Sequence, residues 1–515
     1  MSRVGCEMAR GGHVVQSSRA CPGRKQQEDG SGITIMARHS PSGCNKRQSN
    51  AARRQHDWAV NMLVGLAVIV AYGLGMQMMP SVEIDVEAWN RANPDPALKI
   101  DEVTGALPPI LKLVGLKVDE EYHYDQIVAF LDGRFDVIGR SWVSTPPLYH
   151  ALVATMAWVV GDYSPTAVRR FSAILCFPAL ILFFLCARAL DKDNRVSLSL
   201  LFFLCPIFFP FFFVIYTNML ALLFLLGALW LTLARRYQLA GLVVGLAILV
   251  RQTEIVWAFV LGVIAMGQQD VWRRLVHPGY DWKRALRAVR PVGMVVLVGK
   301  RALRAVGRVW MFGLVGVAFL AFVYWNGGVV LGVAQQTHRE LGYLFPTQGY
   351  VWLFTMFFLF LPLHLWNVPR IGAMLGRRPV LWSIIVVGSF VVYLQTFWAG
   401  HTWNNDPYNL HNRVIIWMRQ DVWTRSLAFL PMLWAACSLC VTPLVHRSFY
   451  WLYPAAILSV LPVALFEQRF FMASVMFFLL FAEWKTVQVD RLTLAMYVLA
   501  TWWVYLGLHS DAFFL

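Results

Sequence analysis

One polar stretch, residues 118–149, carries an unusual density of side chains that could take part in proton transfer. Four acids and a histidine fall within seven residues of it, namely Asp119, Glu120, Glu121, His123 and Asp125. Only 14% of all residues are charged, so this density stands out. A carboxylate can remove a proton from a hydroxyl group, and a histidine can orient it. We therefore expect a reaction site here rather than a solvated surface.

Further polar clusters interrupt the apolar sequence, and each of them contains an arginine or an asparagine. They are Asn218, Arg251 with Glu254, Asn326 with His338, Asp406 with Asn412 and Arg413, and Glu467 with Arg469. Arginine binds phosphate through paired hydrogen bonds and stabilises a phosphate leaving group. Carboxylates and arginines together predict a transferase that acts on a phosphate-linked lipid. Interfacial anchoring is the plain alternative for each arginine.

The composition fixes the setting of these residues. The 515-residue chain is 58% hydrophobic with a mean hydropathy of +0.53, which a membrane protein of many spans can accommodate and a soluble core cannot. The formal charge of +16 is concentrated in residues 1–57 and 273–308, each with ten Lys and Arg. Basic runs beside membrane spans are typical of cytoplasmic loops, so we do not expect nucleic-acid binding.

Alternation of apolar runs and basic loops gives a predicted topology. The first span covers about 58–79, and residues 80–145 follow on the non-cytoplasmic side. Residues 146–161 are predicted to form a juxtamembrane or half-inserted helix, and 239–266 a helical hairpin interrupted at Arg251 to Glu254. The remaining spans are expected at about 171–190, 197–215, 219–233, 309–325, 350–368, 379–399, 425–444, 449–466, 470–485 and 492–508.

This topology divides the chain into a disordered basic cytoplasmic tail, 1–56, and a transmembrane domain, 57–515. Within that domain we expect a non-cytoplasmic catalytic loop with juxtamembrane helices over 80–170 and a basic cytoplasmic loop over 267–308. All the polar clusters then lie on the non-cytoplasmic face. A transporter would place ionisable residues near the midplane within repeats, and no repeat is evident, so the enzyme is favoured. No nucleotide-binding pattern occurs either.

Seven short motifs occur in order between about residues 58 and 485. They include a DExxHxxQ pattern at Asp119, Glu120, His123 and Gln126, a proline-rich element ending at Tyr149, Tyr216-Thr217-Asn218, Arg251-Gln252-Thr253, Trp325-Asn326-Gly327, a segment with Asn412 and Arg413, and Glu467-Gln468-Arg469. With these motifs the chain resembles the glucosyltransferases that use dolichyl-phosphate-glucose to add the last, α-1,2-linked glucose to the lipid-linked oligosaccharide of N-glycosylation. It departs from their pattern at Asn218, Glu254 and Asp406.

The resemblance implies an all-α polytopic fold, a GT-C-type bundle of about 12–13 transmembrane helices. It implies an inverting transfer in which Asp119, or alternatively Glu120, is the base and His123 orients it or contacts the phosphate. Arg251, Arg413 and Arg469 become candidate phosphate ligands. The other candidate substrate-binding residues are Gln126, Tyr149, Asn218, Gln252, Asn326, Asn412 and Glu467, with packing the simpler role for Tyr149.

The implied partners are the membrane, a lipid-phosphate sugar donor and a lipid-linked glycan acceptor. No cofactor is implied, although a divalent ion between Asp119 and Glu120 remains an alternative. The membrane would be that of the endoplasmic reticulum in a eukaryote or the inner membrane in a bacterium. Another sugar or acceptor, as in a bacterial envelope glycan, is the second reading of the function, and a membrane transporter the third.

Overall fold

The computed structural model describes residues 65, 68–73, 75–76, 116, 118–268, 291–332, 335, 344–483, 486–510 and 512–514, and within 291–305 only the side chain of Leu303. Residues 61–515 form one compact unit. The predicted tail 1–56, most of the predicted first span and His338 lie outside the described residues.

The described secondary structure is helical. In chain order the α-helices are α3 (Glu120–Leu131), α4 (Leu148–Val160), α5 (Pro165–Cys176), α6 (Pro178–Ala189), α7 (Arg195–Phe203), α8 (Asn218–Leu233), α9 (Tyr237–Val250), α10 (Ile255–Gly267), α13 (Pro291–Asn326), α14 (Pro346–Leu359), α15 (Leu361–Trp366), α16 (Val368–Arg377), α17 (Pro379–Thr396), α18 (Leu410–Arg419), α19 (Val422–Val441), α20 (Leu452–Val460), α21 (Met472–Phe481) and α22 (Val487–His509). In the described part, β-bridges are limited to two isolated pairs, Asn409 with Phe514 and Leu444 with Ala482. The all-α prediction is confirmed.

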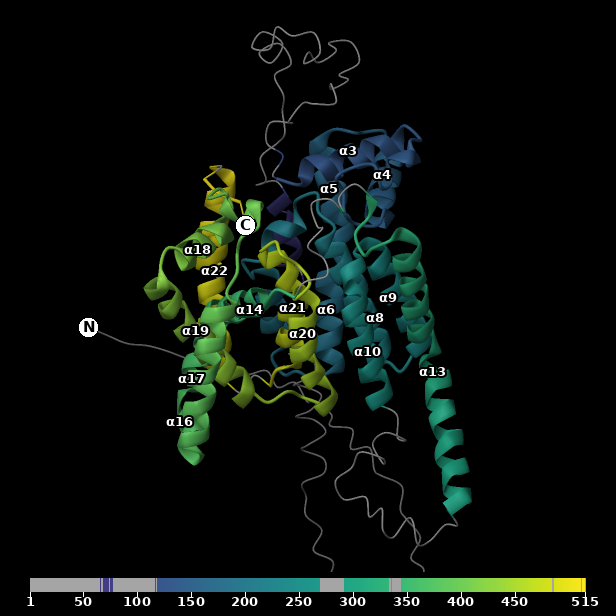
Figure 1. Ribbon diagram of the computed structural model, residues 1–515. Helices are drawn as coiled ribbons and strands as arrows, with labels where there is room; N and C mark the ends of the chain where they lie inside the picture. Colours follow the sequence, from purple (N-terminus) through teal and green to yellow (C-terminus); the bar gives the residue numbers. More distant parts are fainter. Residues whose placement is uncertain are drawn as a thin grey trace, which may run out of the picture. The chain divides into compact units, whose positions relative to one another are not determined.

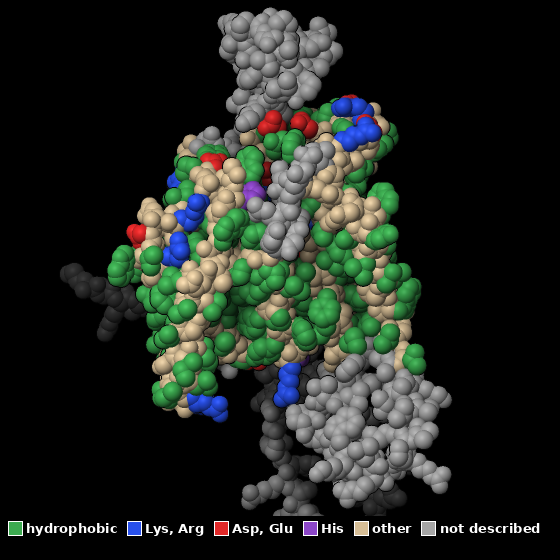
Figure 2. All heavy atoms as spheres, viewed as in Figure 1, with side chains coloured by type: hydrophobic (Ala, Val, Ile, Leu, Met, Phe, Trp, Pro, Cys, Tyr) green, Lys and Arg blue, Asp and Glu red, His purple; other side chains and the backbone are tan. Residues whose placement is uncertain are grey.

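Five helical segments of the described chain are long and apolar enough to cross a membrane: Pro165–Ala189, Val306–Asn326, Pro379–Thr396, Val422–Val441 and Val487–His509. Several shorter apolar helices of 10–17 residues accompany them. Hydrophobic side chains cover the middle of the face shown in Figure 2, while acidic side chains gather towards the end where α3 lies. The chain is therefore an integral, multi-pass membrane protein, and the total of about 13 spans stays a prediction.

The expected span at 197–215 is not one continuous helix. Helix α7 ends at Phe203, and after a break that contains Pro206 the chain forms the short 3-10 helix η3 (Phe209–Phe212). Proline lacks the amide hydrogen and clashes with the preceding turn, so Pro206 and Pro210 prevent a continuous α-helix. The phenylalanines of this broken segment are buried in the core, except Phe209, which is half-buried.

Predicted spans at 350–368, 449–466 and 470–485 are likewise subdivided. The first is split into α14 and α15 at Phe360, the second begins with the 3-10 helix η7 (Arg447–Trp451), and the third begins with η8 (Gln468–Phe471). Pro362 lies at the start of α15, where a proline is tolerated because the first amides of a helix have no intrahelical partner. These breaks place polar residues beside apolar helices.

The predicted hairpin at 239–266 is confirmed. Helices α9 and α10 are joined by the 3-10 helix η4 (Gln252–Glu254), and Arg251 ends α9 in an extended conformation, with φ −145° and ψ 114°. Helix α8 packs against both α9 and α10. The break therefore lies at the same end of the bundle as Asn218, the first residue of α8.

Helix α13 begins earlier than the predicted span at 309–325. It contains 36 residues and starts at Pro291, so the last part of the predicted 267–308 loop is helical. It packs against α9 and α10 (Figure 1). Close approach to α9 occurs at Gly241, where a Cβ atom would lie 2.7 Å from Met311 Cβ.

Helices α3, α4 and α5 form a group at one end of the bundle (Figure 1), with α3 packed on α4 and α4 on α5. Helix α4 follows Pro147 and ends at Gly161, whose φ of +76° suits glycine. The side chain of Ser164 caps α5 by accepting a hydrogen bond from the Ala167 amide. The predicted short helix at 146–161 is thus present, and it belongs to the group that carries the acidic stretch.

Candidate active site

Asp119 immediately precedes α3 and lies at a junction of distant segments. Its Oδ2 accepts a hydrogen bond from Nη2 of Arg469 at 2.6 Å, across 350 residues of sequence. About a third of its side chain, 34%, is exposed. Among the described residues, only Oδ2 of this carboxylate has a hydrogen-bond partner, which leaves Oδ1 available to a substrate.

Arg469 links Asp119 to a second carboxylate. Its Nη2 donates to Oε1 of Glu467 at 2.7 Å, and its Nε donates to Oε2 of the same residue. The guanidinium also lies 5.1 Å from the centre of the Tyr216 ring. Two carboxylates therefore share one arginine through charge-assisted hydrogen bonds.

Tyr216 forms the buried wall of this cluster. Its hydroxyl accepts a hydrogen bond from the Asp119 amide at 3.0 Å, and its ring stacks on Phe514 at a centroid distance of 6.0 Å. The ring of His123 lies 5.4 Å away on another side. Segments from the start of α3, the loop before α8 and the C-terminal end of the chain thus meet around Asp119.

Arg251 forms a second polar group beside the first. Its Nη1 donates to Oδ1 of Asn218 at 3.0 Å and to Oγ1 of Thr217 at 3.4 Å, and its Nε lies 3.8 Å from Oε1 of Glu254. Asn218 Nδ2 in turn lies 3.5 Å from the backbone carbonyl of Arg469. The two arginines that the sequence assigned to phosphate, Arg251 and Arg469, are therefore neighbours.

Two cavities adjoin Arg251. The larger, about 230 Å³, is lined mainly by apolar side chains, among them Phe470, together with the polar Thr145 and Gln252. The smaller, about 30 Å³, lies between Arg251 and Arg469 and also contacts Glu254. Because Arg251 lines both, it separates an apolar chamber from a charged one.

Three buried oxygens on these cavity walls have no hydrogen-bond partner within the described part of the chain. They are Thr145 Oγ1, Gln252 Oε1 and Glu254 Oε2. Buried polar atoms in folded proteins are nearly always satisfied, so each of these needs an explanation. A ligand rich in hydroxyl groups in the larger cavity would satisfy Thr145 and Gln252, whereas Glu254 lines the smaller cavity.

Glu120 has different surroundings from its neighbour Asp119. It is fully buried, and its carboxylate accepts hydrogen bonds from Nε and Nη2 of Arg169 at 3.0 and 2.5 Å. The Ile215 amide donates to Oε1 at 2.7 Å. These contacts tie the start of α3 to α5 and to the loop before α8, which is a positioning role.

His123 contacts another histidine rather than a carboxylate. Its Nδ1 lies 2.9 Å from Nε2 of His150, so one ring donates and the other accepts. Burial, together with the charges of Arg469 and Arg251, lowers the pKa of His123 from 6.5 to about 3. The ring is therefore neutral at physiological pH, and it packs edge-to-face against the ring of Tyr216.

Several residues predicted for substrate binding make other contacts. Gln126 accepts from Ser141, Tyr149 is fully buried against Ser172, and Asn326 binds the carbonyls of Gly328 and Val330. Asn412 binds the carbonyls of Trp403 and Asp406, and Arg413 is exposed and binds those of Pro407 and Ala512. In the described part of the chain, no hydrogen bond joins these five side chains to Asp119 or Arg469.

Gln252 is an intermediate case. Its Nε2 donates to the backbone carbonyl of Ser144 at 2.7 Å, while its Oε1 stays on the wall of the larger cavity. The glutamine therefore joins η4 to the segment before α4 and still offers an acceptor to a ligand.

Three residues of the assembled site were missed by sequence reasoning. Arg169 was not singled out, although an arginine in an apolar segment is itself a signal. Tyr216 was noted only as part of a motif. His411 lies near Arg469. Burial and, after it, the charge of Arg469 lower the pKa of His411 to about 3, although a hydrogen bond with Gln468 acts in the opposite direction.

The acids of this region are arranged for ion pairs with arginine. Within the part of the chain that is described, no three His, Cys, Asp or Glu side chains are grouped so as to hold a metal ion. The carboxylates of Asp119 and Glu120 face different arginines, Arg469 and Arg169.

Comparison with known proteins gives a consistent family. The profile of the DIE2/ALG10 family matches residues 116–480. A Mus musculus protein named Dol-P-Glc:Glc(2)Man(9)GlcNAc(2)-PP-Dol alpha-1,2-glucosyltransferase is 25% identical over 395 residues, which cover 69% of this chain and 81% of the relative. Proteins of the same name from Homo sapiens, 24% identical with the same coverage, and Arabidopsis thaliana, 30% identical over 27% of this chain and 31% of the relative, also match. No solved structure matches significantly.

Proposed function

The chain belongs to the DIE2/ALG10 family, and from this membership we propose that it transfers glucose from dolichyl phosphate to a lipid-linked oligosaccharide in an α-1,2 linkage. The relatives that match it over most of their length are named for that reaction. The protein is then a glycosyltransferase of the N-glycan precursor pathway, and its membrane is that of the endoplasmic reticulum.

The observation that carries the proposal is the hydrogen bonding and exposure of the Asp119 carboxylate. Its carboxylate is held by Arg469 through one oxygen, is partly exposed, and lies beside a second arginine that lines two cavities. A general base needs a free carboxylate oxygen. Asp119 has one on a partly exposed side chain, whereas Glu120 is buried in its ion pair with Arg169.

The bond changes follow from these roles. Asp119 takes the proton of the acceptor hydroxyl while that oxygen forms a bond to the anomeric carbon of glucose. The bond from that carbon to the phosphate oxygen breaks on the opposite face, and dolichyl phosphate leaves with both electrons. Arg251 is the phosphate ligand in this proposal, because a guanidinium stabilises the charge that develops on the leaving group.

The cavity walls support a sugar beside an apolar chain. In the larger cavity Thr145 and Gln252 offer unpaired oxygens to glucose hydroxyls, which are hydrogen-bond donors. The apolar lining of the larger cavity suits the first isoprene units of the donor. A different sugar or acceptor remains the second candidate, because Glu254 and Asn218 depart from the pattern expected of the family.

The test measures transfer of labelled glucose by the purified full-length protein in lipid. We expect product with dolichyl-phosphate-glucose and a lipid-linked oligosaccharide acceptor, and none with a nucleotide sugar in its place. Product from the nucleotide sugar alone would overturn the donor assignment. Movement of the oligosaccharide across sealed vesicles without a new glycosidic bond would instead establish a transporter.

Asp119→Asn tests the base. General-base catalysis contributes about 10²–10⁴-fold to a rate, so we expect kcat to fall within that range. Asp125→Asn, an exposed acid on the same helix, is the matched control and should retain activity. Activity of Asp119→Asn within threefold of the wild type, with an unchanged thermal midpoint, would remove Asp119 from this role.

A further inference from the structure

A third cavity lies away from the Asp119 cluster and plays no part in the proposed transfer. Its volume is about 480 Å³, and its lining consists of Arg235, Arg236, Tyr237, Gln238, Leu239, Gln268 and Arg308. Three of the seven lining residues are arginines, and none is an acid. The cavity therefore has a strongly positive lining.

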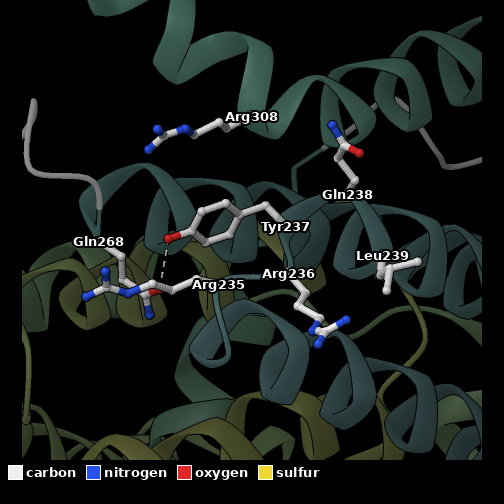
Figure 3. A pocket seen from close by; sticks show the side chains of 7 residues that line it. All are labelled: Arg235, Arg236, Tyr237, Gln238, Leu239, Gln268 and Arg308. Atoms are coloured by element: carbon white, nitrogen blue, oxygen red, sulfur yellow. Dashed lines mark hydrogen bonds between the residues drawn. The ribbon is translucent and has the colours of Figure 1, made fainter.

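The arginines come from two separate parts of the fold. Arg235 and Arg236 form the turn between α8 and α9 and lie below Tyr237 in the view of Figure 3, while Arg308 belongs to α13 and lies above it. Close contact of α9 with α13 at Gly241 holds these two parts together. The positive lining is thus a product of tertiary packing and not of one basic run.

The turn that carries two of the arginines is well defined. The Arg235 amide donates to Thr232 at 2.9 Å and the Arg236 amide to Leu231 at 2.8 Å, which closes the end of α8. Arg235 has a φ of +61°, a conformation that glycine adopts at much lower cost. Arg235 thus occupies the left-handed position that ends α8.

The floor of the cavity is packed. Tyr237 is buried against Ala265 and Val309, and its hydroxyl donates to Oε1 of Gln268 at 3.4 Å (Figure 3). The three arginine side chains have neither an ion pair nor a hydrogen bond with any other residue that the structure describes. In the same view the guanidinium groups of Arg235 and Arg308 lie to the left of Tyr237 and that of Arg236 to the right (Figure 3), and all three residues line the cavity where an anion could bind.

The cavity lies at the end of the bundle opposite the Asp119 cluster. Helix α8 runs from Asn218, which contacts Arg251, to Leu233 beside the turn, and its 16 residues extend about 24 Å. The distribution of basic residues predicts that this turn is cytoplasmic. Exposed Leu239 and Leu242 continue from the cavity along α9, where lipid chains would contact them.

We propose that this cavity, defined by Arg235, Arg236 and Arg308, binds a phosphate monoester at the cytoplasmic surface of the membrane. The monoester is presented by a phospholipid headgroup or by a soluble phosphate. Guanidinium groups form paired, charge-assisted hydrogen bonds with phosphate oxygens, and three of them match a group that carries nearly two negative charges. Binding here is independent of the sugar transfer proposed above.

The test uses purified full-length protein and fluorescent short-chain phosphatidic acid, with equally labelled phosphatidylcholine for comparison. We expect preference for phosphatidic acid and a loss of about fivefold in affinity for each arginine replaced by glutamine. R235Q/R236Q is the main variant. R377Q/R378Q, which removes two exposed arginines at the end of α16, is the matched control. Unlabelled glycerol 3-phosphate is the competitor that represents a soluble phosphate.

The outcomes separate the possibilities. Loss in R235Q/R236Q but not in R377Q/R378Q supports the site. If glycerol 3-phosphate then displaces the labelled lipid as effectively as unlabelled phosphatidic acid does, the site is assigned to a soluble phosphate. If glycerol 3-phosphate does not displace the labelled lipid, the site is assigned to the phospholipid. Equal loss in both variants, or no loss in either, overturns the proposal. If R235Q/R236Q has a lowered thermal midpoint, R308Q, which lies outside the turn, decides in its place.

Discussion

Asp119 and Glu120 are adjacent acids with opposite surroundings. The Asp119 side chain is 34% exposed and the Glu120 side chain 0%, although one peptide bond separates them. A fully buried carboxylate requires a partner charge and hydrogen bonds, which Arg169 and the Ile215 amide supply. Glu120 therefore fixes the start of α3, and Asp119 is presented at its end.

Removing one partner of the Glu120–Arg169 pair should destabilise the protein. Glu120→Gln leaves the Arg169 charge buried without its carboxylate, at a cost of about 3–5 kcal/mol. We expect a thermal midpoint in detergent lower by several degrees. Replacing both residues with leucine should recover part of this loss, since no charge then remains buried. A midpoint for Glu120→Gln equal to that of the wild type would show that the pair contributes nothing.

His123 should make stability depend on pH. Its pKa is about 3 in the folded protein against an ordinary 6.5, so the unfolded chain binds a proton more readily. Its contribution is complete above pH 6.5 and is lost as pH falls towards 3, at about 1.4 kcal/mol per pH unit. We expect the thermal midpoint to fall between pH 7.5 and pH 5. The fall should be smaller in His123→Gln; an equal fall in both proteins would exclude this histidine as a cause.

At the scale of elements, the breaks in helices decide where chemistry is possible. Arg251 follows the last turn of α9, and Arg469 lies in the 3-10 helix η8 before α21. Polar backbone and charged side chains are tolerated in a membrane domain only where protein or a water-filled cavity surrounds them. Helix breaks at one end of the bundle therefore bring the two arginines together.

Contact between α9 and α13 should depend on Gly241. A Cβ atom there would lie 2.7 Å from Met311 Cβ and 3.0 Å from the Phe312 amide nitrogen, so Gly241→Ala must separate the helices. We expect a lowered thermal midpoint despite the higher helix propensity of alanine. Gly245→Ala, where the nearest atom is 3.4 Å away, is the control on the same helix. A midpoint equally lowered in both variants would contradict specific packing at Gly241.

At the scale of the whole molecule, the acidic loop and the α8–α9 turn should lie on opposite sides of the membrane. Arg134 is exposed in the loop after α3, and Gln238 is exposed at the start of α9. In sealed vesicles with the cytoplasmic side outward, a membrane-impermeant maleimide should label Gln238→Cys beyond the wild-type background. Arg134→Cys should react only after permeabilisation. Labelling of both without permeabilisation would refute the predicted topology.

Sequence reasoning recovered the class of fold and part of the site. Composition alone predicts a helical membrane protein, because about 20 apolar residues per span leave few alternatives. The hairpin at 239–266 was predicted correctly from its interrupting charges. The prediction of one continuous helix at 197–215 was wrong, although Pro206 and Pro210 are visible in the sequence.

The sequence by itself determined which residues could do chemistry: Asp119, Arg251, Glu467 and Arg469 were all singled out by charge in an apolar chain. The tertiary structure alone decided which of the candidates meet. Asp119 and Arg469 are 350 residues apart, and their contact depends on how buried helices pack, which no local pattern encodes. For the same reason Arg413, equally conspicuous in sequence, is exposed and donates hydrogen bonds to backbone carbonyls. Tyr216, by contrast, lies against the guanidinium of Arg469.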